Sequence, residues 1–157
     1  MSENAQKAYE AMLVTVGNEA ATGEWFELTQ ERINDFADTT LDHQFIHIDP
    51  EKAAQTPFGG TVAHGFLTLS MLVHLSTNIP IESPRLDGVL MGINYGLNKV
   101  RFLNPVPAGS RIRATSQAVD VVIKGSSVDL TIMMTVEIEG QEKPALIEEW
   151  IGRTVVA

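Results

Sequence analysis

The sequence predicts an α+β fold in which an antiparallel sheet curls around one apolar helix. Residues 65–77 are apolar on nearly every side, which is typical of a helix enclosed by other structure. Residues 128–138 alternate apolar with mostly polar side chains, which is the period of a strand with one buried face. Since other strand-like runs also follow the helix, one sheet can supply the enclosure.

The first part of the chain predicts short elements that lead up to this helix. An amphipathic helix is expected over residues 4–16 and a brief strand over 25–28. Thr29 is a suitable N-cap for a second helix. The apolar face of that helix comprises Ile33, Phe36 and Ala37.

The segment between the second helix and the apolar helix has a mixed pattern. Residues 39–47 show no regular period. Asp49 followed by Pro50 then predicts an N-cap and a first helical position, which open a short helix through Ala54. Proline and paired glycines over residues 57–60 predict a turn.

Four long strands are predicted after the apolar helix. They cover residues 89–103, 110–123, 127–139 and 145–155, with a hairpin turn at Lys124-Gly125. A sheet of this kind leaves one edge open. Because pairing with the same edge of a second copy would cover it, we expect a two-fold homodimer.

Length, composition and charge favour a single soluble domain over residues 1–157. The absence of cysteine excludes disulfides and thiolate metal sites. The net charge of −9, with no basic run, argues against a nucleic-acid partner. Because no signal peptide or membrane-spanning stretch is present, we expect a cytoplasmic protein without a membrane partner.

A carboxylate and an imidazole lie close together in the irregular segment. Asp42 and His47 are five residues apart, shortly before the apolar helix. Such a pair suits proton transfer in both directions, because one group takes a proton while the other returns one. Burial of the carboxyl would raise its pKa and help it act as the acid. An Asp and a His in one loop are also compatible with a purely structural role.

The start of the apolar helix offers a second functional feature, Ala63-His64-Gly65. The first turn of a helix presents backbone N–H groups that have no internal partner. Such a group can hydrogen-bond a thioester carbonyl and stabilise the enolate-like charge that forms when water adds to the β-carbon. Gly65 is also explained by close packing at the helix entrance.

These residues together resemble a known motif. Residues 36–47 (FADTTLDHQFIH), with Ala63-His64-Gly65 and Phe66-Leu67 after them, are similar to the MaoC-like (R)-specific enoyl-CoA hydratases, most of all to the branch of nodulation-protein-N-like sequences. That motif is usually Asp-x-Asn-Pro-(Ile/Leu/Val)-His, with a His-Gly pair at the helix entrance. The similarity covers about residues 25–105 and includes the strand exit around Asn104-Pro105.

The resemblance implies a dimeric hot-dog fold and a set of site residues. Asp42 and His47 become the catalytic dyad, and the Gly65 N–H becomes the donor to the carbonyl, with His64 and Gln44 beside the substrate. Gln44 and Phe45 stand where the family usually has Asn and Pro. Since that Asn is thought to orient the catalytic carboxylate, Gln44 would have to do so with a longer reach.

The implied activity is the reversible hydration of a trans-2-enoyl-CoA to a (3R)-3-hydroxyacyl-CoA. No metal and no cofactor are expected apart from the coenzyme A of the acyl-CoA substrate, although an acyl-carrier protein is an alternative donor. Two other functions remain open at this point. The hot-dog fold also hosts acyl-CoA thioesterases, and a non-catalytic acyl-thioester binding protein is equally compatible with the fold.

Other polar residues are weaker candidates. His43 and His47 have the i, i+4 spacing of a zinc site, but such a pair must lie on a helix. Some cations of the predicted strands could contact the phosphates of coenzyme A, although exposed strand cations are usually only solvated. These cations are Lys99, Arg101, Arg111 and Arg113.

Overall fold

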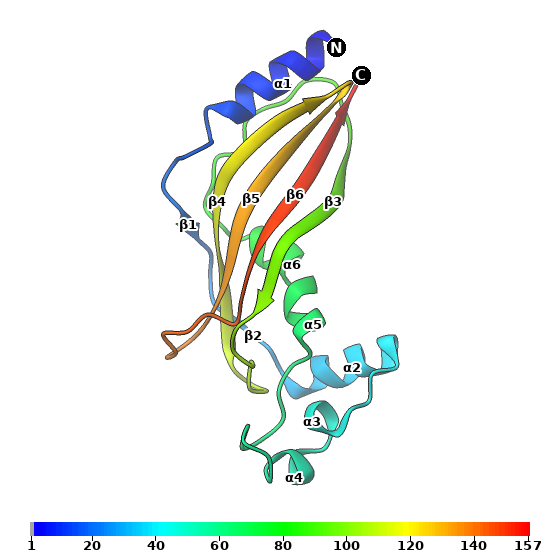
Figure 1. Ribbon diagram of the computed structural model, residues 1–157, viewed down its shortest axis with the longest axis vertical. Coiled ribbons are helices and arrows are strands. Elements are labelled where there is room, and N and C mark those ends of the chain that lie inside the picture. Colours follow the sequence, from blue (N-terminus) through cyan, green and yellow to red (C-terminus); the bar gives the residue numbers. More distant parts are fainter. Residues whose placement is uncertain (1) are drawn as a thin grey trace.

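A single six-stranded antiparallel sheet forms the body of the molecule in the computed structural model, which describes residues 2–157 (Figure 1). Its strand order is β1-β4-β5-β6-β3, and β2 also pairs with β4. The strands are β1 (Ala21–Thr22), β2 (Phe26–Glu27), β3 (Val89–Phe102), β4 (Arg111–Lys124), β5 (Ser127–Ile138) and β6 (Leu146–Val156). The four long strands lie within one residue of their predicted limits, and Gly125, at φ 65°, lies in the predicted hairpin turn between β4 and β5.

The apolar helix lies against this sheet, but it is less regular and less enclosed than predicted. It consists of α5 (Gly65–Ser70) and α6 (Leu72–Ser76), which meet at Met71. The Ser70 hydroxyl donates to the Phe66 carbonyl over 2.7 Å, and such back-bonding bends helices. Leu67, Leu72 and Leu75 enter the core, whereas Phe66 and Val73 are exposed on the side that this chain leaves open.

The main core lies between the helix and the sheet. Its buried side chains come from both layers and from the segment around β2. They include Leu28, Ile33, Leu72, Ile112, Met134 and Leu146. A second cluster forms where α1 (Glu3–Leu13), which is shorter than the predicted helix, covers one end of β4, β5 and β6. The main core therefore holds the apolar helix against the sheet.

Three helices form a small lobe at the other end of the molecule (Figure 1). They are α2 (Gln30–Thr40), α3 (Phe45–Ile48) and α4 (Pro50–Ala53). Thr29 caps α2 and Asp49 caps α4, each through its side chain, as predicted. The prediction of an irregular segment over residues 39–47 was wrong at both ends. The α2 helix extends to Thr40, and His47 lies in α3, a single turn too short to show a period.

Strand β3 forms an open edge of the sheet. It pairs only with β6 among the strands of residues 2–157, and its side chains are nearly all exposed. Seven of these are large and apolar: Val89, Leu90, Met91, Ile93, Tyr95, Leu97 and Phe102. An exposed apolar edge is unusual for an isolated chain. Within residues 2–157, no helix is both long and apolar enough to cross a lipid bilayer.

Candidate active site

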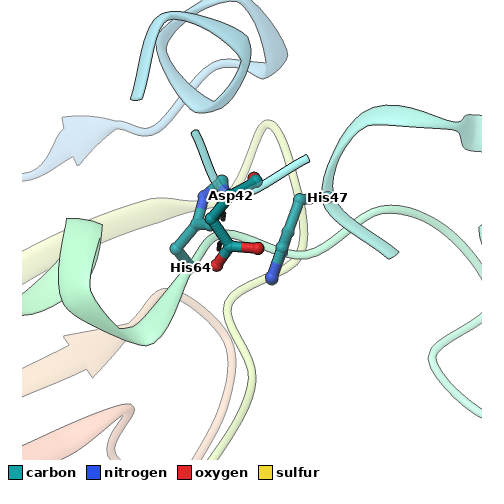
Figure 2. A group of neighbouring side chains, drawn as sticks. All are labelled: Asp42, His47 and His64. Atoms are coloured by element: carbon teal, nitrogen blue, oxygen red, sulfur yellow. Dashed lines mark hydrogen bonds and ion pairs between the residues drawn. The ribbon is translucent and has the colours of Figure 1, made fainter. Parts of the chain in front are cut away.

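The fold brings Asp42, His47 and His64 together at the junction of the lobe and the apolar helix (Figure 2). One carboxylate oxygen of Asp42 and one ring nitrogen of each histidine all lie within 4.8 Å of one another. Asp42 follows α2, His47 belongs to α3, and His64 is the N-cap residue of α5. The convergence that the sequence predicted for Asp42 and His47 is therefore present, and His64 is part of it.

The ring of His47 has a defined hydrogen-bonding state. Its Nδ1 lies 2.6 Å from the Val62 carbonyl oxygen, which can only accept, so Nδ1 carries the proton and donates. Nε2 is then left with a free lone pair. Burial lowers the pKa of His47, and the nearby His64 acts in the same direction. His47 is thus a neutral imidazole at pH 7, with a basic nitrogen on the side of Asp42.

His64 is buried behind Asp42 and His47. It is 2% exposed, and its ring stacks on that of His47 with centroids 3.8 Å apart. Its Nε2 donates to the backbone carbonyl of Asp42 over 2.9 Å, and Phe36 packs on its other side. His64 therefore fixes the position of Asp42 through the backbone and that of His47 through ring stacking.

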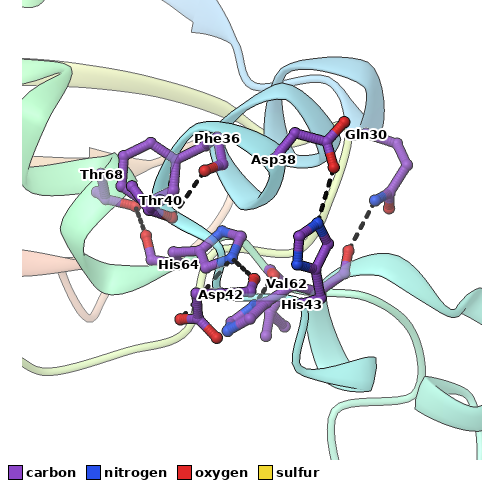
Figure 3. Close-up of polar contacts among 10 residues, drawn as sticks. Gln30, Phe36, Asp38, Thr40, Asp42, His43, Val62, His64 and Thr68 are labelled. Carbon is purple, nitrogen blue, oxygen red and sulfur yellow. Dashed lines mark hydrogen bonds and ion pairs between the residues drawn. The ribbon is translucent and has the colours of Figure 1, made fainter.

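Hydrogen bonds of the Gln30 side chain hold the short α3 helix, and the sequence did not single out this residue (Figure 3). The Gln30 amide nitrogen donates to the His47 carbonyl over 2.7 Å. The amide oxygen of Gln30 accepts from the Thr61 hydroxyl. Because Gln30 lies in the first turn of α2, where a polar residue is unremarkable, no signal in the sequence distinguished it from a solvated side chain.

Asp42 is presented by a backbone turn at the surface. Leu41 ends α2 in the left-handed region with φ 62°, which is uncommon for a residue that is not glycine, asparagine or aspartate. The chain reverses there, and the Asp42 side chain remains 54% exposed. The burial that the sequence argument invoked for this carboxyl is therefore absent from the single chain, since the turn lies outside the core.

Gly65 occupies the first position of α5, where its N–H needs no partner within the helix. A Cβ atom at this position would lie only 3.0 Å from the ring of Phe102. Any larger residue would have to displace that ring or the helix start. Gly65 and Phe102 line a cavity of about 290 Å³ together with Thr68. The Gly65 N–H thus has space beside it for a small acyl group.

The two remaining motif positions lie at the surface. Gln44 precedes α3, is exposed, and makes no capping hydrogen bond through its side chain. Its backbone carbonyl instead accepts from the His47 N–H over 2.9 Å. His43 pairs with Asp38, with 2.8 Å between Nε2 and Oδ1. The i, i+4 pair of histidines therefore does not form a common face, because His43 precedes the helix that carries His47.

The Asp42, His47 and His64 cluster also has the composition of a cation site. A ring nitrogen binds a metal along a lone pair in the plane of the ring, whereas these two rings lie face to face. The Nε2 of His64 is in addition committed as a donor. The arrangement suits proton transfer better than metal binding, and the expected absence of a metal stays a prediction.

The candidate cations for coenzyme A phosphates differ in their partners. Lys99 contacts Glu149 over 2.6 Å, Arg111 contacts Glu139 over 2.9 Å and Arg113 contacts Glu137 over 2.6 Å. Arg101 contacts the carbonyl of Val100. Within residues 2–157, Arg101 is the one of the four that no carboxylate pairs with, so its charge is the least neutralised.

Comparison with protein families places most of the chain in one group. Residues 12–140 match the model of the MaoC like domain. The 3-hydroxyacyl-thioester dehydratase Z of Mycobacterium tuberculosis is 49% identical over 145 residues, which cover 92% of this chain and 93% of that protein. Nodulation protein N of Rhizobium leguminosarum bv. viciae is 46% identical over 138 residues, covering 87% and 84%.

Solved structures agree on the fold. A monoamine oxidase regulatory protein from Archaeoglobus has a TM-score of 0.72 at 27% identity, covering 88% of this chain and 90% of its own. The (R)-hydratase from A. caviae has a TM-score of 0.67 at 20% identity, covering 85% and 92%. The α+β hot-dog fold predicted from the sequence is confirmed by these likenesses.

Proposed function

The chain belongs to the MaoC-like family and is a hydratase/dehydratase, and from that premise we propose that it interconverts trans-2-enoyl and (3R)-3-hydroxyacyl thioesters of coenzyme A. The observation that carries the proposal is the free Nε2 of His47, held beside the carboxyl group of Asp42. A reversible hydration needs such a pair because it moves one proton to and one proton from the substrate.

The proposed steps follow from these two groups. A water molecule between Asp42 and His47 adds its oxygen to C3, and His47 Nε2 takes the proton that the water loses. The electrons of the C2=C3 bond pass to the thioester as an enolate. Asp42, which enters this step as the carboxylic acid, gives a proton to C2. The proton on His47 then passes to the Asp42 carboxylate and restores the starting state. The geometry also allows the two roles to be exchanged.

The thioester carbonyl is proposed to accept a hydrogen bond from the Gly65 N–H. This donor is fixed by the backbone, so it needs no reorganisation as negative charge develops on the oxygen. The adjoining cavity and the Phe102 ring then hold the first atoms of the acyl chain. We propose that His64 and Gln44 support the site, His64 through its hydrogen bond to the Asp42 carbonyl and Gln44 through the hydrogen bond that its carbonyl accepts from the His47 N–H.

The direct test is loss of the conjugated-enoyl absorbance of crotonyl-CoA, with the handedness of the product determined. Formation of the (3R) alcohol supports the proposal. An inert enoyl series combined with thiol release from a saturated acyl-CoA would instead indicate a thioesterase. Binding of the acyl-CoA without either reaction would indicate a non-catalytic acyl-thioester binding protein. A cytoplasmic location, and the absence of any cofactor besides substrate coenzyme A, stay predictions.

The pH dependence of hydration should reflect the state of His47. Since burial lowers the pKa of His47 below its ordinary 6.5, the basic form is present at neutral pH and is lost only on acidification. We expect kcat/KM to be level near pH 7 and to fall below about pH 6.5. His47→Gln should remove this acid limb along with most of the activity. An acid limb centred above pH 7 would contradict the assignment of His47 as base.

We also propose that the enzyme is a homodimer paired through β3. The open edge, its exposed apolar side chains and the exposed face of the apolar helix lie on the side of the molecule that a second copy would cover. The wild-type protein should have twice the chain mass of 17.2 kDa, measured by sedimentation or light scattering. The double substitution Leu90→Lys with Met91→Lys should yield monomers, because it places charge on the edge.

A matched control for the dimer is Val14→Lys. Val14 is a similarly exposed apolar residue, but it follows α1 and lies away from β3. This variant should keep the mass of the wild type. Retention of dimers in the Leu90→Lys, Met91→Lys variant would show that subunits associate through another surface.

A further inference from the structure

The carboxyl of Glu148 is buried inside the fold. The residue is 2% exposed, and its Oε2 has no hydrogen-bond partner within residues 2–157. An unpaired buried polar group destabilises the folded state, so its presence calls for a compensating role. Desolvation raises the pKa of Glu148 to about 7, and a neutral carboxyl that both donates and accepts is therefore populated at neutral pH.

Glu148 lines a cavity of about 540 Å³ between the apolar helix and strands β3 and β6. In β6 it pairs with Met134, a core residue, so both face the helix side of the sheet. The other lining residues are Leu69, Ser70, Leu72, Val73, Asn94, Gly96, Leu97 and Trp150. The cavity is therefore mostly apolar, with a single ionisable group in its wall.

The larger cavity lies further along the helix from the site around Gly65. Leu69 and Val73 come four and eight residues after Gly65, which is roughly 6 and 12 Å along a helix at 1.5 Å per residue. Thr68 lines the cavity at Gly65, and its neighbour Leu69 lines the larger one. An acyl chain with its carbonyl at the Gly65 N–H can therefore extend beside the helix toward Glu148.

We propose that the larger cavity holds the acyl chain and that Glu148 selects chains bearing an oxygen substituent, a hydroxyl or a keto group, distant from the thioester. This inference rests on the proposed function and names its substrate class. The oxygen would supply the hydrogen bond that Glu148 lacks within the chain. A plain hydrocarbon chain would leave the buried carboxyl unpaired, and sites of that kind discriminate strongly against a ligand that lacks the polar group.

The experiment compares enoyl-CoA substrates of equal length that end in a methyl group or carry a hydroxyl at successive distal carbons. The wild type should prefer the hydroxylated chain by about tenfold or more in kcat/KM, with a maximum at one carbon position. Glu148→Gln keeps a donor and an acceptor and should keep the preference. Glu148→Leu should reverse it and raise the melting temperature, because an unpaired polar group is removed.

The matched control is Glu149→Leu. Glu149 is the next carboxylate in β6 but is paired with Lys99, away from the cavity, so the preference should not change. An equal preference for the hydroxylated chain in the wild type and in Glu148→Leu would overturn the inference. A lower melting temperature of Glu148→Leu, with the preference for the hydroxylated chain intact, would also overturn it. In either case, Glu148 would serve the structure alone.

Affinities of the corresponding saturated acyl-CoAs separate this inference from the proposed function. These compounds cannot be hydrated, so their dissociation constants report on the cavity alone. A Glu148-dependent preference in binding without turnover would uphold the selectivity and reject hydration. Turnover without any preference for the hydroxylated chain would uphold hydration and reject the selectivity.

Discussion

Asp42→Asn should lower the kcat for enoyl-CoA hydration by a factor of about 10²–10⁴, and His47→Gln should do the same. Each substitution preserves shape and removes one proton-transferring group. The double variant should be hardly slower than either single variant, because under the proposed mechanism the two groups act as a unit on one water molecule. The measurement is the initial rate of absorbance loss at saturating crotonyl-CoA, with a melting curve for each variant.

The chain supplies a matched control in Asp38 and His43. They form another aspartate–histidine pair in the same segment, with 2.8 Å between Oδ1 and Nε2, but both are exposed and outside the cluster. Asp38→Asn and His43→Gln should leave kcat within about twofold of wild type, since exposed ion pairs contribute little. A loss in these variants as large as that in Asp42→Asn would show that the segment's fold, rather than the dyad, had been disturbed.

Deleting the Gly65 N–H should cost about 10²–10³ in kcat, the effect found for removal of one oxyanion donor. Proline removes this N–H and is tolerated at the first helical position. The preceding His64, at φ −59° and ψ 138°, already has the backbone conformation that a following proline requires. Since a side chain at 65 would meet Phe102 at 3.0 Å, the substitution is best made in a Phe102→Ala background.

The comparison for this donor is Gly65→Ala with Phe102→Ala, which adds a Cβ atom but keeps the N–H. It should retain the kcat of Phe102→Ala alone, whereas the Gly65→Pro, Phe102→Ala variant should not. If both Gly65 variants were equally slow, the added side chain would be responsible, and the Gly65 N–H would lose its assigned part in catalysis.

The sheet was predictable from the sequence because its signals are local. Alternation over 128–138 and the glycine of the β4–β5 turn define two strands and their pairing without reference to the rest of the chain. The apolar helix was predictable in position but not in exposure. Phe66 and Val73 have the same apolar character as Leu67 and Leu72, and only the extent of the sheet decides which of them it covers.

The site was predictable only in part. Asp42, His47 and Gly65 were proposed from their residue types and spacing together with the resemblance to the hydratase motif, and the fold brings Asp42 and His47 together. Gln30 was not, because its importance arises from contacts with the distant His47 carbonyl and Thr61. Glu148 was also missed. In the sequence it is one of two adjacent glutamates, and only the strand register distinguishes the buried carboxyl from the paired one.

The stacking of His47 on His64 also affects how firmly His47 holds a proton. The two ring centroids are 3.8 Å apart, and the electrostatic effect of His64 adds to that of burial in lowering the pKa of His47. Under the proposed mechanism, a proton that His47 takes from water is therefore held weakly and passes on readily, which returns His47 to its basic form before the next turnover.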